Sequence, residues 1–194
     1  MKRKTISTPP VLSEEIQLEN VVGVTVINNA SMARSSSGIL AYPAGCVIVL
    51  LEGGGGGQRH IINKDRKTVT CLAWAAGGNH LVSGESGHKP AVKVWSLQTA
   101  ESPLVALTGH KFGVGSVAFS PDTKYVISVI SRSHCMPVSI VFSHQVGTEH
   151  DMVVNVWDWR NSVRLASNKM SFNVTAISFA KDGSYFVAAG NRSD

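Results

Sequence analysis

A serine, a histidine and an aspartate are the residue types that could carry acyl-transfer chemistry in this chain. Ser128, His110 and Asp151 are the candidates for nucleophile, base and orienting acid. In such a set the histidine removes the serine proton, and the carboxylate holds the imidazole in the required orientation. No pair of carboxylates stands out as an acid/base couple, because the 13 acidic residues are spread along the chain.

Two other patterns suggest ligand chemistry but match it poorly. Four side chains could be imagined as zinc ligands: His134, Cys135, His144 and His150. Their spacing matches no common structural zinc site. The pentaglycine at 53–57 invites a phosphate-loop interpretation, which requires a following Gly-Lys and Ser or Thr, but the run continues into Gln58. We therefore predict no metal, no cofactor and no small-molecule substrate.

Composition and charge disfavour two further classes. The net charge is +5, with 18 basic residues that are scattered apart from one run at residues 2–4. Nucleic-acid binding needs a basic patch, usually with stacking aromatics, and neither is visible. The longest apolar run, 46–51, is far too short to span a membrane. Three cysteines and the absence of an apolar leader in residues 1–10 favour a reducing, cytoplasmic location.

A strand–turn–strand pattern occurs three times and must position these residues. The first strands, at 69–74, 114–119 and 174–179, are rich in β-branched and aromatic residues. Turn residues such as Pro-Asp, Asp-Gly or Gly-Gly-Asn follow each of them. Third strands at 91–95 and 153–157 end in tryptophan, and fourth strands are expected near 104–107 and 164–167. Four short strands with a period of 45 residues predict propeller blades.

The second of these repeats, the one with its first strand at 114–119, resembles the WD-repeat β-propeller family. Its signature dipeptides are Gly109-His110, before the first strand, and Trp157-Asp158, at the end of the third. In that family a His, a Ser or Thr, an Asp and the Trp form a hydrogen-bonded set inside the blade. The resemblance implies that His110, Ser128, Asp151 and Trp157 form this structural network.

A structural network makes physical sense, because a buried indole N–H and a buried imidazole both need hydrogen-bond partners. Asp151 stands six residues before Trp157, in the turn before the tryptophan strand, where it could orient the imidazole. We therefore interpret the serine, histidine and aspartate as structural, and we predict that the chain is not an enzyme. The preceding blade departs from the pattern, because Lys89 takes the aspartate position before Trp95.

Further motifs resemble the opening blades of the family of mitogen-activated protein kinase-binding protein 1 and WD-repeat-containing protein 62. They are LAYPAGCVIVL at 40–50, GESGH at 84–88, HKFGV at 110–114, VVNVWDW at 153–159 and ASNK at 166–169. The expected fold is all-β, an incomplete WD-repeat β-propeller of about three and a half four-stranded blades. The expected organisation is a disordered or leader segment at 1–17, an atypical first blade at 18–66, a second blade at 67–108, a third blade at 109–170 and a truncated fourth blade at 171–194.

An insertion near 129–146 interrupts the third blade. Trp95 follows Trp74 by 21 residues, whereas Trp157 follows Phe119 by 38. A functional loop is one explanation for the 17 extra residues. A retained short intron is the other, because a Val129 codon begins with GT and a Gln145 codon can be CAG, the ends expected of an intron.

Two function hypotheses follow. The first is a non-catalytic protein–protein interaction scaffold module whose partners are other proteins. The resemblance implies a role in c-Jun N-terminal kinase signalling or spindle-pole organisation, in the cytoplasm or at the centrosome, with kinase-docking segments outside this chain. The second is a truncated or mis-spliced product without stable independent activity, because an unclosed ring leaves apolar faces and strand edges uncovered.

Overall fold

The computed structural model describes residues 18–26, 29–53, 57–99, 102–130 and 152–191. Within these residues the chain forms one short 3₁₀ turn, η1 (Asn29–Ser31), and fourteen β-strands. The expectation of an all-β fold is confirmed. No helix in the described part of the chain is long and apolar enough to cross a membrane.

Three antiparallel sheets contain four strands each, in chain order from one edge to the other. The first sheet comprises β1 (Ala33–Arg34), β2 (Leu40–Ala44), β3 (Val47–Leu51) and β4 (Gln58–Ile62). The second comprises β5 (Val69–Trp74), β6 (His80–Glu85), β7 (Ala91–Ser96) and β8 (Val105–Thr108). The third comprises β9 (Val114–Phe119), β10 (Tyr125–Ile130), β11 (Met152–Asp158) and β12 (Val163–Met170).

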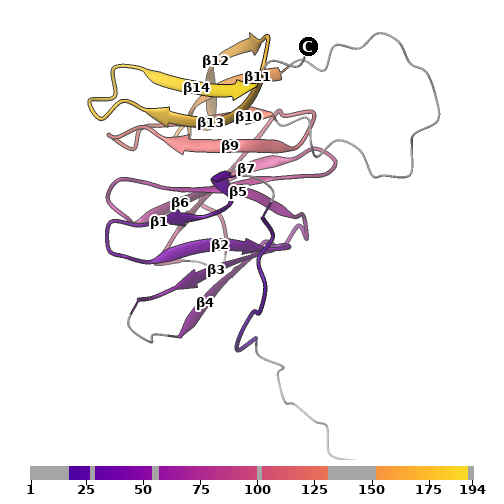
Figure 1. Ribbon diagram of the computed structural model, residues 1–194, viewed down its shortest axis with the longest axis vertical. Coiled ribbons are helices and arrows are strands. Elements are labelled where there is room, and N and C mark those ends of the chain that lie inside the picture. The colour runs from indigo at the N-terminus through magenta and orange to yellow at the C-terminus, as the bar shows by residue number, and fades with distance from the viewer. Residues whose placement is uncertain (1–17, 27–28, 54–56, 100–101, 131–151, 192–194) are drawn as a thin grey trace, which may run out of the picture.

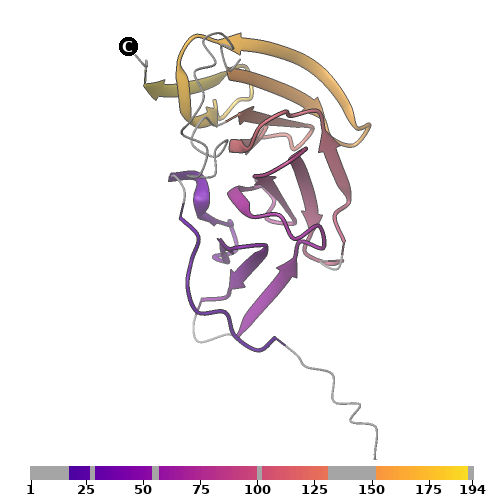
Figure 2. The same cartoon turned by 90° about the vertical axis from the view of Figure 1, so that its right-hand side faces the viewer.

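A fourth sheet has two strands, β13 (Asn173–Phe179) and β14 (Phe186–Asn191). The four sheets follow one another from the indigo to the yellow end of the chain (Figure 1). The view at 90° shows them side by side in an open arc (Figure 2). This is the open propeller of three complete four-strand units and one half unit that the sequence predicts.

The hairpins that join the first and second strands share one turn geometry. Gly78, Thr123 and Gly183 each lie four residues after the aromatic residue of the preceding strand, and their φ angles are 70°, 57° and 73°. The N–H of each donates to the carbonyl three residues earlier. Positive φ explains the two glycines, because it is a conformation that other residues rarely adopt. Thr123 adopts it without being glycine.

The hydrophobic core lies between neighbouring sheets rather than within one layer. One cluster joins the second sheet to the third, and includes Cys71, Val94, Phe119 and Trp157. The sheets approach closely where Gly84 of β6 faces β9, since a Cβ there would meet Val114 Cγ1 at 2.6 Å. Close packing of both faces explains why strands such as β6, β7 and β10 are buried along almost their whole length.

Two segments of the domain organisation predicted from the sequence lie wholly or mostly outside the described residues. These are the leader at 1–17 and most of the insertion near 129–146, of which only Val129 and Ile130 are described, at the end of β10. The hypotheses of a functional loop and a retained intron therefore stay predictions. The fourth strand of the third sheet, β12, extends over eight residues and is longer than the expected strand near 164–167.

Candidate functional site

Three of the four predicted network residues meet inside the third sheet. His110 precedes β9, Ser128 lies on β10 and Trp157 lies on β11. The Trp157 indole N–H donates to Ser128 Oγ over 2.7 Å, and His110 Nε2 lies 2.7 Å from the same oxygen. Because a hydroxyl has one proton and two lone pairs, it can accept from the indole and donate to Nε2. Ser128 thus joins the second and third strands to the segment that leads into the first.

At Gly109, the first residue of the Gly-His dipeptide, the backbone conformation requires a glycine. Its φ is 132°, a conformation that residues with side chains rarely adopt. The space beside it is adequate, because a Cβ would lie 3.6 Å from Trp157 Cη2, an ordinary contact. The glycine therefore serves to turn the chain so that His110 enters the sheet.

Burial keeps His110 neutral. The side chain is 4% exposed, and its ring lies edge-on to Trp157 with centroids 5.9 Å apart. Desolvation, with a smaller contribution from the nearby Arg164 cation, lowers the pKa of His110 from its ordinary 6.5 to about 4. A neutral imidazole can accept the Ser128 proton at Nε2 while it carries its own proton on Nδ1.

Asn155 belongs to this network and was missed by the sequence analysis. It faces Ser128 across the β10–β11 pair, and its Nδ2 lies 3.4 Å from His110 Nδ1. Its Oδ1 is buried and has no hydrogen-bond partner among the described residues. A half-turn of the amide would direct Oδ1 toward the Nδ1 proton. Asn155 stands two residues before Trp157, and this alternation along a strand is the signal that could have revealed it.

The structure describes one of the two aspartates named in the sequence analysis and does not describe the other. Asp151 lies outside the described residues, so its expected contact with His110 stays a prediction. Asp158, the second half of the Trp-Asp dipeptide, is the last residue of β11 and accepts from the N–H and side-chain amide of Asn161 in the following turn. These hydrogen bonds, that of the side-chain amide above all, lower the pKa of Asp158. Asp158 therefore orders a turn and does not contact the described members of the network.

The second sheet keeps the tryptophan–serine pair and replaces the rest. Trp95 Nε1 donates to Ser83 Oγ over 2.9 Å, at the positions that correspond to Trp157 and Ser128. In place of the histidine and asparagine lies an ionic cluster. Its centre is Lys93 Nζ, which lies 2.6 Å from each of three oxygens, those of Glu85, Asn63 and Asp65.

Every charge in this cluster has a partner. Glu85 is fully buried, and its second oxygen accepts from the N–H of Ala91 over 3.2 Å and lies 3.7 Å from Lys67 Nζ. The hydrogen bond and charge of Lys93 lower the pKa of Asp65. Glu85 stands two residues after Ser83, and Lys93 two before Trp95, so the sequence already places both on the network face of their strands.

The arrangement does not suit the chemistry first considered. Ser128 is completely buried and its hydroxyl is engaged with Trp157 and His110, so a substrate could not reach it. No group of three or more His, Cys, Asp or Glu side chains in the described parts of the chain could hold a metal ion. The four imagined zinc ligands, including Cys135 and His150, lie outside those parts, as does the centre of the pentaglycine.

Replacement of Ser128 by alanine should destabilise the fold, because it leaves the buried indole N–H and imidazole nitrogen without their common partner. We expect the free energy of unfolding to fall by about 1–3 kcal/mol, measured by urea denaturation. Ser167→Ala is the matched control, since Ser167 is exposed on β12 of the same sheet and its removal should change stability little. Equal effects of the two substitutions would contradict the assignment.

Acid should weaken the fold through His110. The folded protein keeps this side chain neutral to about pH 4, whereas the unfolded chain binds the proton near pH 6.5. The free energy of unfolding should therefore decrease as the pH falls from 6.5 toward 4, by on the order of 3 kcal/mol. Urea denaturation across this range should show a shallower pH dependence in His110→Gln. An unchanged slope in that variant would show that other groups are responsible.

Replacement of Lys93 by methionine should be more damaging than the loss of an exposed lysine. It leaves the carboxylate of Glu85 buried without its main counter-charge, which costs about 3–5 kcal/mol. The double variant Glu85→Gln with Lys93→Met should recover much of this loss, and the exposed Lys64→Met should be neutral. Urea denaturation of the wild type and these three variants checks the coupling, and a double variant no more stable than Lys93→Met would argue against it.

Comparison with known proteins agrees with this geometry. Residues 57–96 and 101–158, just over half of the chain, match the model of the WD domain, G-beta repeat. Mitogen-activated protein kinase-binding protein 1 of Mus musculus is 47% identical over 182 residues, which cover 93% of this chain and 11% of the relative. WD repeat-containing protein 62 of Sus scrofa is 39% identical over 191 residues, covering 98% of this chain and 11% of the relative.

Among solved structures, a chain of hydrazine synthase from Kuenenia stuttgartiensis resembles the fold with a TM-score of 0.61. The similarity covers 80% of this chain and 41% of that chain, at 14% sequence identity, and so concerns the fold alone. The repeated hairpins, the tryptophan–serine hydrogen bonds in two sheets and the sequence matches agree: the chain belongs to the WD domain, G-beta repeat (WD40) family.

Proposed function

We propose that this chain is a non-catalytic module for protein–protein interaction. The observation that carries the proposal is that the only candidate catalytic set with described geometry, Ser128 with His110, is used inside a sheet as a buried hydrogen-bonded pair. Membership of the WD40 family supports the same function, because repeat architectures present extended surfaces to other proteins. The side chains that could have carried catalysis instead stabilise the fold, and the surface of the module remains available for binding.

The partners belong to kinase signalling or to the spindle pole, and the module acts in the cytoplasm or at the centrosome. The support is similarity to mitogen-activated protein kinase-binding protein 1, whose name states that it binds such a kinase, and to WD repeat-containing protein 62. This chain spans 11% of the length of each of these relatives. The partner of this part of the fold is therefore a component of the same assemblies and need not be the kinase itself.

Competition in cells tests the interaction function. The tagged full chain is expressed, crosslinked and purified, and the captured proteins are quantified with and without an excess of the untagged chain. We expect signalling or spindle-pole components to be captured saturably and to be displaced by the competitor. The Ser128→Ala variant with Trp157→Phe, which lacks the internal hydrogen bonds, is the matched control for non-specific capture. Capture that resists competition, or that increases in the control, would contradict the proposal.

A second candidate is that the chain alone has no stable activity. Tyr185, Phe186 and Val187 at the start of β14 are 62%, 37% and 55% exposed, and Leu165 on β12 is 54% exposed. An uncovered apolar strand of this kind is a site of association. A broad, concentration-dependent thermal transition of the purified chain would support this candidate. A sharp, concentration-independent transition of a monomer would favour the interaction module.

A further inference from the structure

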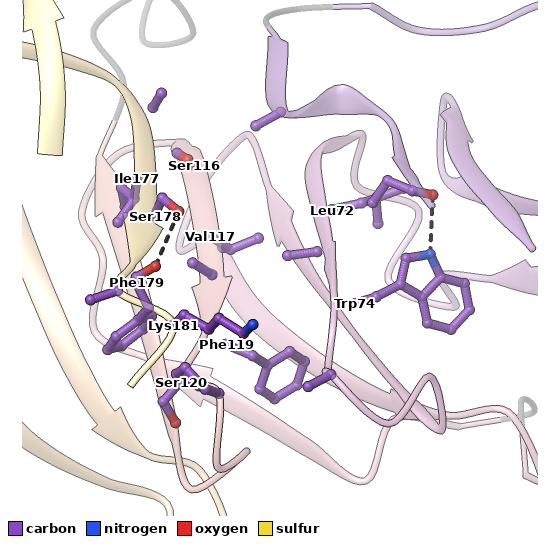
Figure 3. Close-up of a pocket in the computed structure, with 18 of the residues that line it drawn as sticks. Leu72, Trp74, Ser116, Val117, Phe119, Ser120, Ile177, Ser178, Phe179 and Lys181 are labelled. Atoms are coloured by element: carbon purple, nitrogen blue, oxygen red, sulfur yellow. Dashed lines mark hydrogen bonds between the residues drawn. The ribbon is translucent and has the colours of Figure 1, made fainter. Parts of the chain in front are cut away.

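A cavity of about 530 Å³ lies among the innermost strands, and none of its lining residues belongs to either hydrogen-bonded network (Figure 3). It is bounded by β1, by the later halves of β5, β9 and β13, and by Ala30 of η1. It extends to the hairpin turns that follow these strands, at Ala76, Pro121 and Lys181. Its volume is within the range of about 300–1,000 Å³ that ligand pockets have.

The walls of the cavity are mainly apolar. Trp74, Phe119 and Phe179 end β5, β9 and β13, so each of three hairpins contributes an aromatic ring from the equivalent position. The Trp74 N–H donates to the carbonyl of Ala33 over 3.0 Å, which leaves the indole to offer apolar surface. Aliphatic side chains line the remainder of the inner strands, and Figure 3 shows Leu72, Val117 and Ile177 among them. These surfaces suit an apolar side chain.

Both ionisable side chains that line the cavity are cations. Arg34 at the end of β1 and Lys181 in the β13–β14 turn are exposed, and no aspartate or glutamate lines the cavity. Neither cation forms an ion pair with an acid in the described parts of the chain. Two exposed cations among apolar lining residues favour a ligand that carries negative charge.

The aspartates next in sequence to the lining residues Pro121 and Lys181 are engaged by their own turns. Ser120 Oγ donates to Asp122 over 2.6 Å, and Ser184 Oγ donates to Asp182 over 2.7 Å. These hydrogen bonds lower the pKa of both carboxyl groups, and Lys124 lies 3.6 Å from Asp122. The acids therefore remain ionised and occupied in the turns, while Arg34 and Lys181 are available to a ligand.

The backbone at the cavity can also bind. β5, β9 and β13 are each an edge strand of their sheet, so one side of each pairs with no other strand among the described residues. Such an edge offers N–H and C=O groups to an extended segment of another chain. A peptide can use these groups, whereas a rigid small molecule would match few of them.

We propose that this cavity binds a short acidic and apolar peptide segment of a partner protein. An apolar side chain of the segment fills the space between the aromatic residues, and acidic side chains of the segment pair with Arg34 and with Lys181. The proposal rests on the interaction function proposed above and names the chemistry of its ligand. It places the binding site at the hairpin-turn end of the inner strands.

Fluorescence anisotropy with the purified full chain tests the proposal. The probe is a fluorescein-labelled hexapeptide of alternating leucine and glutamate, and the reference is the same peptide with lysine in place of glutamate. We expect the acidic peptide to bind with an affinity that decreases as NaCl is raised, and the basic peptide to bind at least about tenfold more weakly. Failure of the acidic peptide to bind, or equal binding of the two peptides, would overturn the proposal.

Charge reversal locates the site. The double variant Arg34→Glu with Lys181→Glu should weaken binding of the acidic peptide at least about tenfold. Lys124→Glu is the matched control, because Lys124 is exposed on the β9–β10 turn outside the cavity and its change should leave the affinity within about twofold. Circular dichroism should show the same fold in all three proteins, since both target side chains are exposed. Wild-type affinity in the double variant would refute the site.

Two further outcomes separate the alternatives. Displacement of the peptide by oligo(dT), with the same dependence on NaCl, would identify a general polyanion surface and overturn the peptide site. Absence of peptide binding combined with saturable capture of proteins in the cellular competition experiment would refute this cavity alone. The interaction function would then stand with a different surface.

Discussion

A tryptophan indole that is buried between two sheets must find an acceptor for its N–H, and in both the second and the third sheet that acceptor is a serine hydroxyl on the neighbouring strand. This hydrogen bond connects the third strand of the sheet to the second. Because each sheet packs against its neighbours on both faces, water could not replace the missing acceptor cheaply. The remainder of each network is arranged around this pair.

The two sheets surround the same pair with different chemistry. The third sheet uses a neutral set, in which burial holds the pKa of His110 well below its usual range. The second uses opposite charges, in which Lys93 is surrounded by three oxygens. Neutral groups lose less hydration when they are buried, whereas a buried ion pair is stable only while every partner is present. The two networks should therefore respond differently to acid and to the loss of one member.

The proposed binding site uses parts of the molecule that do not belong to the two hydrogen-bonded networks. Most polar residues inside the two networks are hydrogen-bonded to one another, so the binding site proposed here lies at edges, turns and the cavity between the inner strands. There the three aromatic ends of β5, β9 and β13 come together because the hairpins repeat, and Arg34 and Lys181 add positive charge from segments far apart in the chain. A scaffold of repeated hairpins can thus build a binding surface from positions that no single repeat contains.

The sequence by itself determined the strands, the aromatic ends, the hairpin turns and the tryptophan–serine pair of the third sheet, because alternation, turn residues and repeat spacing are local properties. It led to His110 and Ser128 through the Gly-His and Trp-Asp dipeptides. It missed Asn155 and the Glu85–Lys93 cluster, since an alternating polar residue shows its partner only when the neighbouring strand is in register. Only the tertiary structure placed Arg34 and Lys181 on the same cavity and buried Ser128, because contacts between sheets and burial depend on how separate segments pack.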